Sequence, residues 1–332
     1  MSTTALQPLR YLDGAAVQAS MPPVEERLHL AEITMRALAS GAAQLPPKIG
    51  LFPRPADSFA HAMPAHLRAD DTGSDLVGIK WVLGFPTNNA IGVPAIHAIA
   101  ILNDPVTGVP TAILDAGPIT AHRTAAVSGL AIRHWGPRNL GRPARAAIVG
   151  AGTQGHAHLP VLAHLLPDVD LAIFDSSRAR ADALAAAANA TAGIGRARSA
   201  DTAQAAVRDA DVVITAASFG PVKQVMGPEW VAEEALVVPV DYATYASAAL
   251  AAAAALFLVD ERGQFEKNRE VGEFDDYRDP DAMIGEALIA GTARPAGRVL
   301  VSHLGVGLND VVFANAILQL ATAAGRGIVL PR

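Results

Sequence analysis

The chain has 332 residues, which is long enough for two domains that each bury a hydrophobic core. Its net charge is −6 with no basic stripe, so we expect no nucleic-acid partner. It has no cysteine, which excludes disulfides and a cysteine nucleophile and is typical of a cytoplasmic protein. Residues 246–259 form the longest apolar stretch, too short to cross a membrane, and we see no secretory signal, so no membrane partner is expected.

In the first third of the chain, the spacing of apolar residues predicts a helix followed by strands. Apolar residues recur at helical spacing from Pro23 to Gly41, where the glycine is typical of a helix end. Alternation predicts a strand over 76–85, in which Lys80 shares a face with small residues and should have room beside it. Further strands over 96–102 and 109–114 predict a separate antiparallel or mixed sheet.

A helix is predicted next, from an N-cap at Thr120 to about Trp135. Arg123 would lie in its first turn, where the helix dipole disfavours a cation. Such a cation makes sense if it shares a bound anion. The alternative is a solvated surface arginine.

The stretch 146–155, AAIVGAGTQG, is the strongest motif in the chain. An apolar strand runs into a G-x-G-x-x-G loop and then into a helical pattern, which predicts a Rossmann dinucleotide-binding fold. The first glycine permits the tight turn, the second admits a pyrophosphate, and the third allows close packing of helix on strand. The residues expected to bind the cofactor here are Gly150, Gly152, Thr153, Gln154 and Gly155.

Asp175 ends the next apolar strand, 25 residues after Gly150, near the spacing of about 20 at which an acid holds the adenosine ribose. An acid there repels a 2′-phosphate, so NAD(H) is favoured. Ser176, Ser177 and Arg178 follow and suit a phosphate, which keeps NADP(H) as an alternative. Asp175 could also serve only to cap the helix that starts at Ser177.

From residue 144 onward strands alternate with helices, which predicts a parallel α/β sheet. The predicted strands are 144–150, 170–175, 211–217, 236–240, 256–259 and 299–302. A capped helix is predicted over 279–291 and a closing helix over 309–324. The apolar stripe of that closing helix should cover the first domain rather than the second.

Three segments resemble the ornithine cyclodeaminase and mu-crystallin family over nearly the whole chain: GIKWVLGFPTNN, DAGPITAHRTAAVSGLA and VGAGTQGHAHL. The resemblance implies an α/β protein with a Rossmann NAD(P)-binding domain at 123–304. An α+β substrate-binding and dimerisation domain would comprise 1–122 and 305–332. It also implies a homodimer, NAD(H) or NADP(H) as cofactor, and a small α-amino or α-imino acid as substrate.

The resemblance also implies roles for individual residues. Lys80 and Arg123 match the family's ligands for the substrate carboxylate, with Lys48 as a weaker third ligand. Asp241 matches the acid that contacts the substrate amine and transfers a proton, so Lys80 and Asp241 are the expected catalytic residues. From the residues alone, Asp241 could equally be a loop or helix-cap aspartate.

Two segments depart from the family pattern: SHLGVG at 302–307, and the unusually charged 264–277. His303 in the first could be a proton donor, a nicotinamide neighbour or a structural histidine. His156 and His158 are two residues apart on one helix and point in different directions, so we predict no metal site.

Three functions fit these residues. The first is an NAD(P)H-dependent oxidoreductase that interconverts a cyclic or N-substituted α-imino acid and the α-amino acid by hydride transfer. The second is ornithine cyclodeaminase, which forms proline and ammonia with catalytic NAD. The third is a non-catalytic ligand-binding protein of the mu-crystallin type, which would not need the carboxylate ligands. The altered 302–307 segment favours the first.

Overall fold

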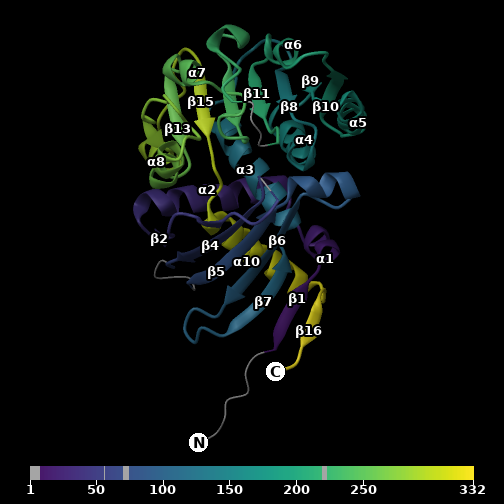
Figure 1. The fold of residues 1–332 in the computed structure, drawn as a ribbon, viewed down its shortest axis with the longest axis vertical. Helices are drawn as coiled ribbons and strands as arrows, with labels where there is room; N and C mark the ends of the chain where they lie inside the picture. The colour runs from purple at the N-terminus through teal and green to yellow at the C-terminus, as the bar shows by residue number, and fades with distance from the viewer. Residues whose placement is uncertain (1–7, 56, 70–74, 219–222) are drawn as a thin grey trace, which may run out of the picture. The chain divides into compact units, whose positions relative to one another are not determined.

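The computed structural model describes residues 8–55, 57–69, 75–218 and 223–332. The chain divides into two compact units, which are described separately (Figure 1). The first unit comprises Met1–Arg123 and Val306–Arg332, and the second comprises Thr124–Gly305. The division falls within helix α3 (Gly117–Trp135).

The first unit contains a mixed sheet, as predicted, with strands in the order β16-β1-β7-β6-β5-β4-β2 and with β3 beside β4. Strands β1 and β7 are parallel and all other neighbours are antiparallel. The strands are β1 (Leu9–Leu12), β2 (Ala43–Gln44), β3 (Ile49–Leu51), β4 (Phe59–Leu67), β5 (Leu76–Gly84), β6 (Ile96–Asn103), β7 (Pro110–Asp115) and β16 (Ile328–Leu330).

Helix α10 (Gly307–Ala323) packs on β4, β5 and β6 of this sheet and against α2 (Val24–Ser40). Helix α2 ends as predicted, with Gly41 in the left-handed conformation at φ 74°. At the start of α10 the backbone comes so near β4 that a Cβ on Gly307 would lie 2.5 Å from the carbonyl oxygen of Met63. The unit also contains α1 (Gly14–Ala19) and a 3-10 turn, η1 (Pro86–Ile91).

Strand β5 places Lys80 on one face together with Gly78 and Gly84, as the alternation predicted, and the structure shows that this face is buried. The expected room beside Lys80 at those glycines is wrong, however. A Cβ on Gly84 would overlap the ring of Phe59, and one on Gly78 would lie 2.5 Å from the carbonyl oxygen of Ile101. The two glycines therefore allow neighbouring groups to pack closely and leave no space for a ligand.

Helix α3 begins four residues earlier than predicted, so Thr120 is inside the helix and is not its N-cap. The cause is Asp115 at the end of β7, whose carboxylate accepts a hydrogen bond of 2.9 Å from the Gly117 amide. Arg123 consequently lies in the second turn, and the argument from the helix dipole at the first turn does not apply.

The second unit is a parallel sheet in the order β10-β9-β8-β11-β12-β15-β13-β14, and this confirms the predicted α/β fold (Figure 1). The strand order reverses direction between β8 and β11, the point at which doubly wound sheets bind ligands. Its strands are β8 (Arg145–Val149), β9 (Val169–Phe174), β10 (Ile194–Ser199), β11 (Val212–Thr215), β12 (Leu236–Pro239), β13 (Leu256–Val259), β14 (Ala282–Met283) and β15 (Val299–Ser302). Its helices are α4 (Thr153–Leu165), α5 (Arg178–Asn189), α6 (Ala203–Val207), α7 (Ala248–Ala252), α8 (Arg262–Glu270), α9 (Ile284–Ala290) and the 3-10 turn η2 (Pro228–Trp230).

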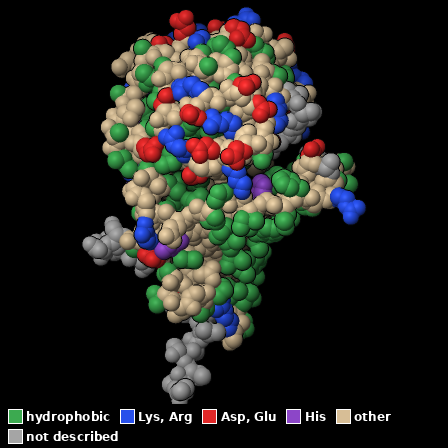
Figure 2. Space-filling model, turned by 60° about the vertical axis from the view of Figure 1, so that its left-hand side comes forward, with side chains coloured by type: hydrophobic (Ala, Val, Ile, Leu, Met, Phe, Trp, Pro, Cys, Tyr) green, Lys and Arg blue, Asp and Glu red, His purple; other side chains and the backbone are tan. Residues whose placement is uncertain are grey.

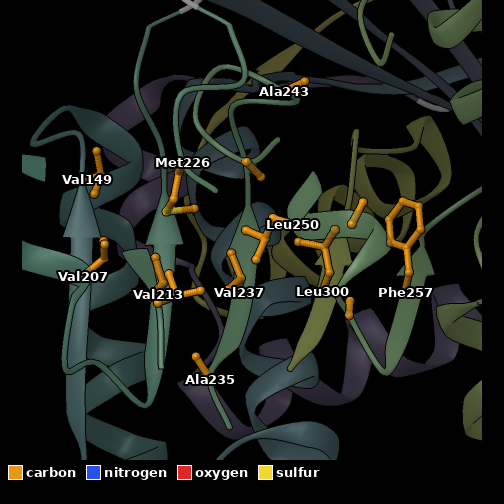
Figure 3. Close-up of a cluster of buried hydrophobic side chains, with 14 of the residues drawn as sticks. Val149, Val207, Val213, Met226, Ala235, Val237, Ala243, Leu250, Phe257 and Leu300 are labelled. Atoms are coloured by element: carbon orange, nitrogen blue, oxygen red, sulfur yellow. The ribbon is translucent and has the colours of Figure 1, made fainter. Parts of the chain in front are cut away.

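A hydrophobic core joins the strands of this sheet on one face (Figure 3). Five of its side chains come from five different strands and are at most 1% exposed: Val149, Val213, Val237, Phe257 and Leu300. Burying each such side chain contributes on the order of 1.5–3 kcal/mol, which keeps the strands in register. Because the strands are parallel, their carboxyl ends meet along one edge of the sheet, and Asp241 and His303 follow two of these ends.

The sheet of the first unit also exposes apolar side chains to solvent. Every residue of β3 and of β16 is exposed, and Phe52 beside β3 is 83% exposed. Figure 2 shows hydrophobic side chains over much of the visible surface of this unit. Patches of this kind mark interaction surfaces. Within the described part of the chain, no helix has both the length and the apolar character needed to span a membrane.

Candidate functional site

Two buried cations and one buried acid form an ion triad in the first unit. The Lys80 ammonium lies 2.8 Å from one carboxylate oxygen of Asp310, and Nε of Arg123 lies 3.2 Å from the other. The three side chains are 2%, 8% and 0% exposed for lysine, arginine and aspartate. They come from β5, α3 and α10, so three separate parts of the chain converge on one point.

Asn309, the neighbour of Asp310, ties these elements together. Its amide nitrogen donates to the carbonyl oxygen of Arg123 at 3.3 Å, and its amide oxygen accepts from Thr34 Oγ1 on α2 at 3.3 Å. Both Asn309 and Thr34 are fully buried. The start of α10 is thereby fixed to α2 and α3, which holds Asp310 between the two cations.

The electrostatics of the triad leave it able to attract a further anion. Burial, together with repulsion from Arg123 and Lys48, lowers the pKa of Lys80 to about 7 against the attraction of Asp310. With Lys80 protonated, two cations and one carboxylate leave one positive charge in a nearly dry environment. His61 lies within the field of Lys48 and Lys80, and burial together with these two cations lowers its pKa to about 4.

The structure thus brings Lys80 and Arg123 together, with Lys48 near enough to affect the pKa of Lys80. Asp310 was not predicted from the sequence as a site residue. The available signal was an acid in the first turn of a helix expected to pack on the first domain, where it would meet two cations that require an anion.

Asp241 belongs to the second unit and lies beyond the carboxyl end of β12. It is 1% exposed; its carboxylate accepts hydrogen bonds from Thr215 Oγ1 at 2.6 Å and from the Ala217 amide at 3.1 Å. Burial raises its pKa to about 7, and these two hydrogen bonds only partly oppose the rise. Asp241 therefore gains and loses a proton near neutral pH. The next helix, α7, is capped by Ser247 instead.

The glycine loop has the form that a bound pyrophosphate requires. Gly150 adopts φ 113°, and a Cβ there would lie 2.8 Å from the Ala217 amide nitrogen. A Cβ on Gly155 would lie 2.5 Å from the carbonyl oxygen of Gly150. At Gly152, in contrast, a Cβ would meet nothing within 4 Å, so the loop is open where α4 begins at Thr153. These residues fit a dinucleotide cofactor.

Asp175 connects this loop to the end of β9. Its carboxylate accepts 2.8 Å hydrogen bonds from the amides of Ala151 and Ser177, and it pairs with Arg180 at 2.8 Å. Burial alone would raise the pKa of Asp175, but these partners outweigh burial and lower it. Arg178 pairs instead with Asp182 and Asp201. The arginine at Asp175 is therefore Arg180, which sequence analysis did not identify.

No group of three or more histidine and acidic side chains that could hold a metal ion occurs in the described ranges. The parallel sheet with its glycine loop defines a dinucleotide-binding α/β unit, joined in this chain to a mixed-sheet unit with a buried cation pair. The chain belongs to the ornithine cyclodeaminase/mu-crystallin family, whose model matches residues 15–323.

Comparisons with individual proteins agree with this family. The nodulation efficiency protein NfeD of Rhizobium meliloti is 31% identical over 332 residues, covering 98% of this chain and 99% of that protein. An archaeal alanine dehydrogenase dimer with bound NAD superposes with a TM-score of 0.82 at 25% identity, covering 98% and 99% of the two chains. The Δ1-pyrroline-2-carboxylate reductase of Thermococcus litoralis, in complex with NADH and L-proline, shares the fold with a TM-score of 0.84 at 22% identity, covering 96% and 99%. The family comprises NAD-dependent reductases, dehydrogenases and cyclodeaminases.

Proposed function

We propose that this protein is an NAD(H)-dependent oxidoreductase that interconverts an α-imino acid, cyclic or N-substituted, and the corresponding α-amino acid. The observation that carries the proposal is the buried ion triad, in which Lys80 and Arg123 converge on one carboxylate and retain one positive charge. Within a family of nicotinamide enzymes, such a cation pair suits a substrate that carries a carboxylate next to its reacting carbon.

Lys80 and Arg123 bind and orient the substrate carboxylate in this proposal, and Lys48 adds a third positive charge. Each charge-assisted hydrogen bond contributes roughly 1.5–3 kcal/mol. Arg123 supplies a planar guanidinium that fixes orientation, whereas Lys80 supplies a point charge. Two fixed cations restrict the rotation of the substrate, and this restriction positions its α-carbon for reaction.

The glycine loop and Asp175 would hold NAD(H), with Gly152 and Thr153 facing the pyrophosphate and Asp175 the adenosine ribose. When bound, the cofactor supplies or accepts the hydride at the α-carbon. Asp175 favours NAD(H) over NADP(H) because a carboxylate repels a 2′-phosphate. A 2′-phosphate would be favoured by Arg180, Ser176 and Arg178. The contribution of Arg178 is smaller because it pairs with two other acids.

Asp241 handles the proton that accompanies the hydride. Reduction of the C=N bond adds hydride to carbon and one proton to nitrogen, and Asp241 donates that proton. In the reverse direction its carboxylate accepts the proton from the amine. A carboxyl group with a pKa of about 7 is matched to both directions near neutral pH.

The exposed apolar strands of the first unit support a homodimer formed through this unit, which would also bind the substrate. The exposed apolar side chains of β3 and β16, at opposite ends of the strand order, would be covered by a second copy. Light scattering at micromolar concentration should give the mass of a dimer, and replacing Phe52 by Asp should shift the equilibrium toward monomer.

The function is tested with NADH and a panel of cyclic imino acids or of α-keto acids with amines. The expected result is stoichiometric loss of NADH absorbance with formation of the amino acid. Release of ammonia from ornithine or lysine without net change in nicotinamide absorbance would instead identify a cyclodeaminase. Cofactor binding without turnover of any substrate would favour a ligand-binding role of the mu-crystallin type.

A further inference from the structure

A chain of three buried polar side chains crosses the second unit. His158 on α4 and His303 after β15 both direct Nε2 at the hydroxyl of Ser128 on α3, at 2.8 and 2.9 Å. The other ring nitrogen of His158, Nδ1, lies 2.7 Å from the carbonyl oxygen of Gln154 in the glycine loop. His158 and Ser128 are fully buried, and His303 is 2% exposed.

The hydrogens of this chain can be assigned because one end is a carbonyl oxygen, which can only accept. Nδ1 of His158 must therefore carry a proton and donate to Gln154. Burial lowers the pKa of His158 to about 4, so the ring is neutral at physiological pH and its Nε2 is an acceptor. The Thr124 carbonyl oxygen also lies 3.4 Å from the Ser128 hydroxyl, but Nε2 of His158 has no hydrogen of its own, so the shorter 2.8 Å contact requires Ser128 to donate its only hydroxyl hydrogen to His158.

The same reasoning then fixes His303. Because the Ser128 hydrogen is used toward His158, the short contact between Ser128 and His303 requires Nε2 of His303 to donate. An imidazole ring whose single hydrogen is on Nε2 has Nδ1 as its hydrogen-bond acceptor. The chain is directional, from His303 through Ser128 and His158 to the backbone of Gln154.

A series of hydrogen bonds that ends on a backbone carbonyl oxygen can orient side chains, but it cannot relay a proton. The carbonyl of Gln154 takes up no proton, so His158 cannot pass one onward. What the chain does is fix the tautomer and the ring orientation of His303, in the same way that a second hydrogen bond fixes a catalytic or metal-binding histidine.

His303 lies at the edge of the parallel sheet where a hydrogen-bond acceptor could contact the cofactor. It follows the carboxyl end of β15, and Asp241 lies beyond the carboxyl end of the neighbouring strand β12. The carboxyl edge of a doubly wound sheet is where the cofactor binds. The nicotinamide ring carries a carboxamide whose NH₂ group donates two hydrogen bonds and needs an acceptor.

We propose that His303 accepts a hydrogen bond from the nicotinamide carboxamide through Nδ1, and that Ser128 and His158 are positioning residues that hold His303 in the required tautomer. The proposal rests on the proposed function in so far as that function requires NAD(H). The same hydrogen bonds would connect the nicotinamide site with the pyrophosphate site, because the series that orients His303 ends at Gln154 in the glycine loop.

The first experiment needs no cofactor. Nitrogen-15 NMR of protein labelled at histidine, with signals assigned through His158→Gln and His303→Gln, should show a neutral His158 protonated on Nδ1 and a His303 protonated on Nε2. Ser128→Ala should remove the fixed preference of His303 between its tautomers. A His303 protonated on Nδ1 in the wild type, or one whose tautomer is unchanged by Ser128→Ala, would overturn the inference.

The second experiment measures binding by fluorescence titration with NADH and with the reduced 3-acetylpyridine analogue, whose methyl ketone has no N–H to donate. The wild type should prefer NADH by about five- to tenfold, the value of one hydrogen bond. His303→Ala should abolish this preference, His303→Asn should restore part of it, and Ser128→Ala should reduce it.

The matched control is His156→Ala, which removes an exposed histidine two residues from His158 on the same helix and should leave the preference unchanged. An undiminished preference of His303→Ala for NADH would overturn the inference about His303 but would leave the proposed function intact. Failure of the wild type to bind either dinucleotide would overturn the proposed function, and the tautomers measured by NMR would separate the two cases.

Discussion

Asp310 in the first unit and Asp241 in the second are both almost completely buried, yet their surroundings differ in kind. Asp310 faces two cations at 2.8 and 3.2 Å, whereas Asp241 faces a hydroxyl and a backbone amide. A nearby opposite charge favours the ionised form of an acid, while burial with only neutral donors favours the protonated form. The first arrangement suits the holding of charge and the second the exchange of a proton.

Lys80 shows how closely balanced the first arrangement is. Desolvation lowers its pKa to about 7 in spite of the adjacent carboxylate of Asp310. A second carboxylate, from a substrate, would raise that pKa again and keep Lys80 protonated. In the proposed function the ion triad should therefore bind the substrate carboxylate most tightly below about pH 7, and its affinity should fall as Lys80 loses its proton above that pH.

The largest effect is expected from Asp241→Asn, which removes the proposed proton donor and leaves a side chain of the same shape. Proton transfer by a positioned group contributes typically 10²–10⁴-fold, so kcat for imino-acid reduction should fall by that factor. NADH affinity should change little, which a fluorescence titration can establish. In the wild type, kcat for reduction should decline above about pH 7 as Asp241 loses its proton. A variant with near-normal kcat would refute the assigned role.

Replacing Arg123 or Lys80 by Ala should lower kcat/KM by roughly ten- to several-hundred-fold, because about 1.4 kcal/mol corresponds to one decade. Arg123→Lys keeps the charge and loses the planar fork, so it should still lose much of the activity. A substrate with an amide in place of its carboxylate should be poor for the wild type and little affected by either mutation. Loss of cofactor binding or of folding in these variants would show that the two cations are structural.

A smaller effect, dependent on pH, is expected from Asp310→Asn. The variant lacks the one attraction that raises the pKa of Lys80, so Lys80 should lose its proton below pH 7. KM for the substrate should therefore rise by about tenfold at pH 8 and by much less at pH 6, as a shift of about one pKa unit requires. Steady-state kinetics at the two pH values test this. An increase in KM that is equal at both would indicate simple loss of structure.

An effect of similar size, on cofactor preference and not on turnover, concerns Asp175, whose carboxylate combines both kinds of partner, two amides and an arginine. Asp175→Ser should shift the ratio of NADH to NADPH affinity toward NADPH by about tenfold, as expected for one charge-assisted interaction. Arg180→Ala should shift the ratio the other way. Fluorescence titration of both cofactors measures the ratio, and tighter NADPH binding by the wild type would mean that the basic residues dominate.

The sequence predicted those parts of the fold that depend on local patterns. The strand–glycine loop–helix unit, the end of α2 at Gly41 and the alternation of side chains along β5 follow from spacing within a few residues, and the structure has all three. Strand β10 was not predicted because arginines occupy exposed positions in it at the edge of the sheet. The start of α3 was misplaced because Asp115, at the end of a strand, caps it.

The candidate site was only half predictable for a related reason. Lys80 and Arg123 were identified through the family resemblance, but the acid between them comes from a distant part of the sequence. No periodicity links residue 80 to residue 310. Likewise, the sequence alone does not decide whether Arg178 or Arg180 pairs with Asp175, because the choice depends on side-chain geometry at the start of a helix.

The topology of the first unit has a consequence for biosynthesis. Its sheet is completed by β16 beside β1, and its face is covered by α10, so both elements come from the segment after residue 305. On the ribosome every strand of the second unit is made before this segment emerges. Lys80 and Arg123 therefore lack their partner Asp310 during most of translation. The second unit can fold first, and the last part of the chain then closes the first unit.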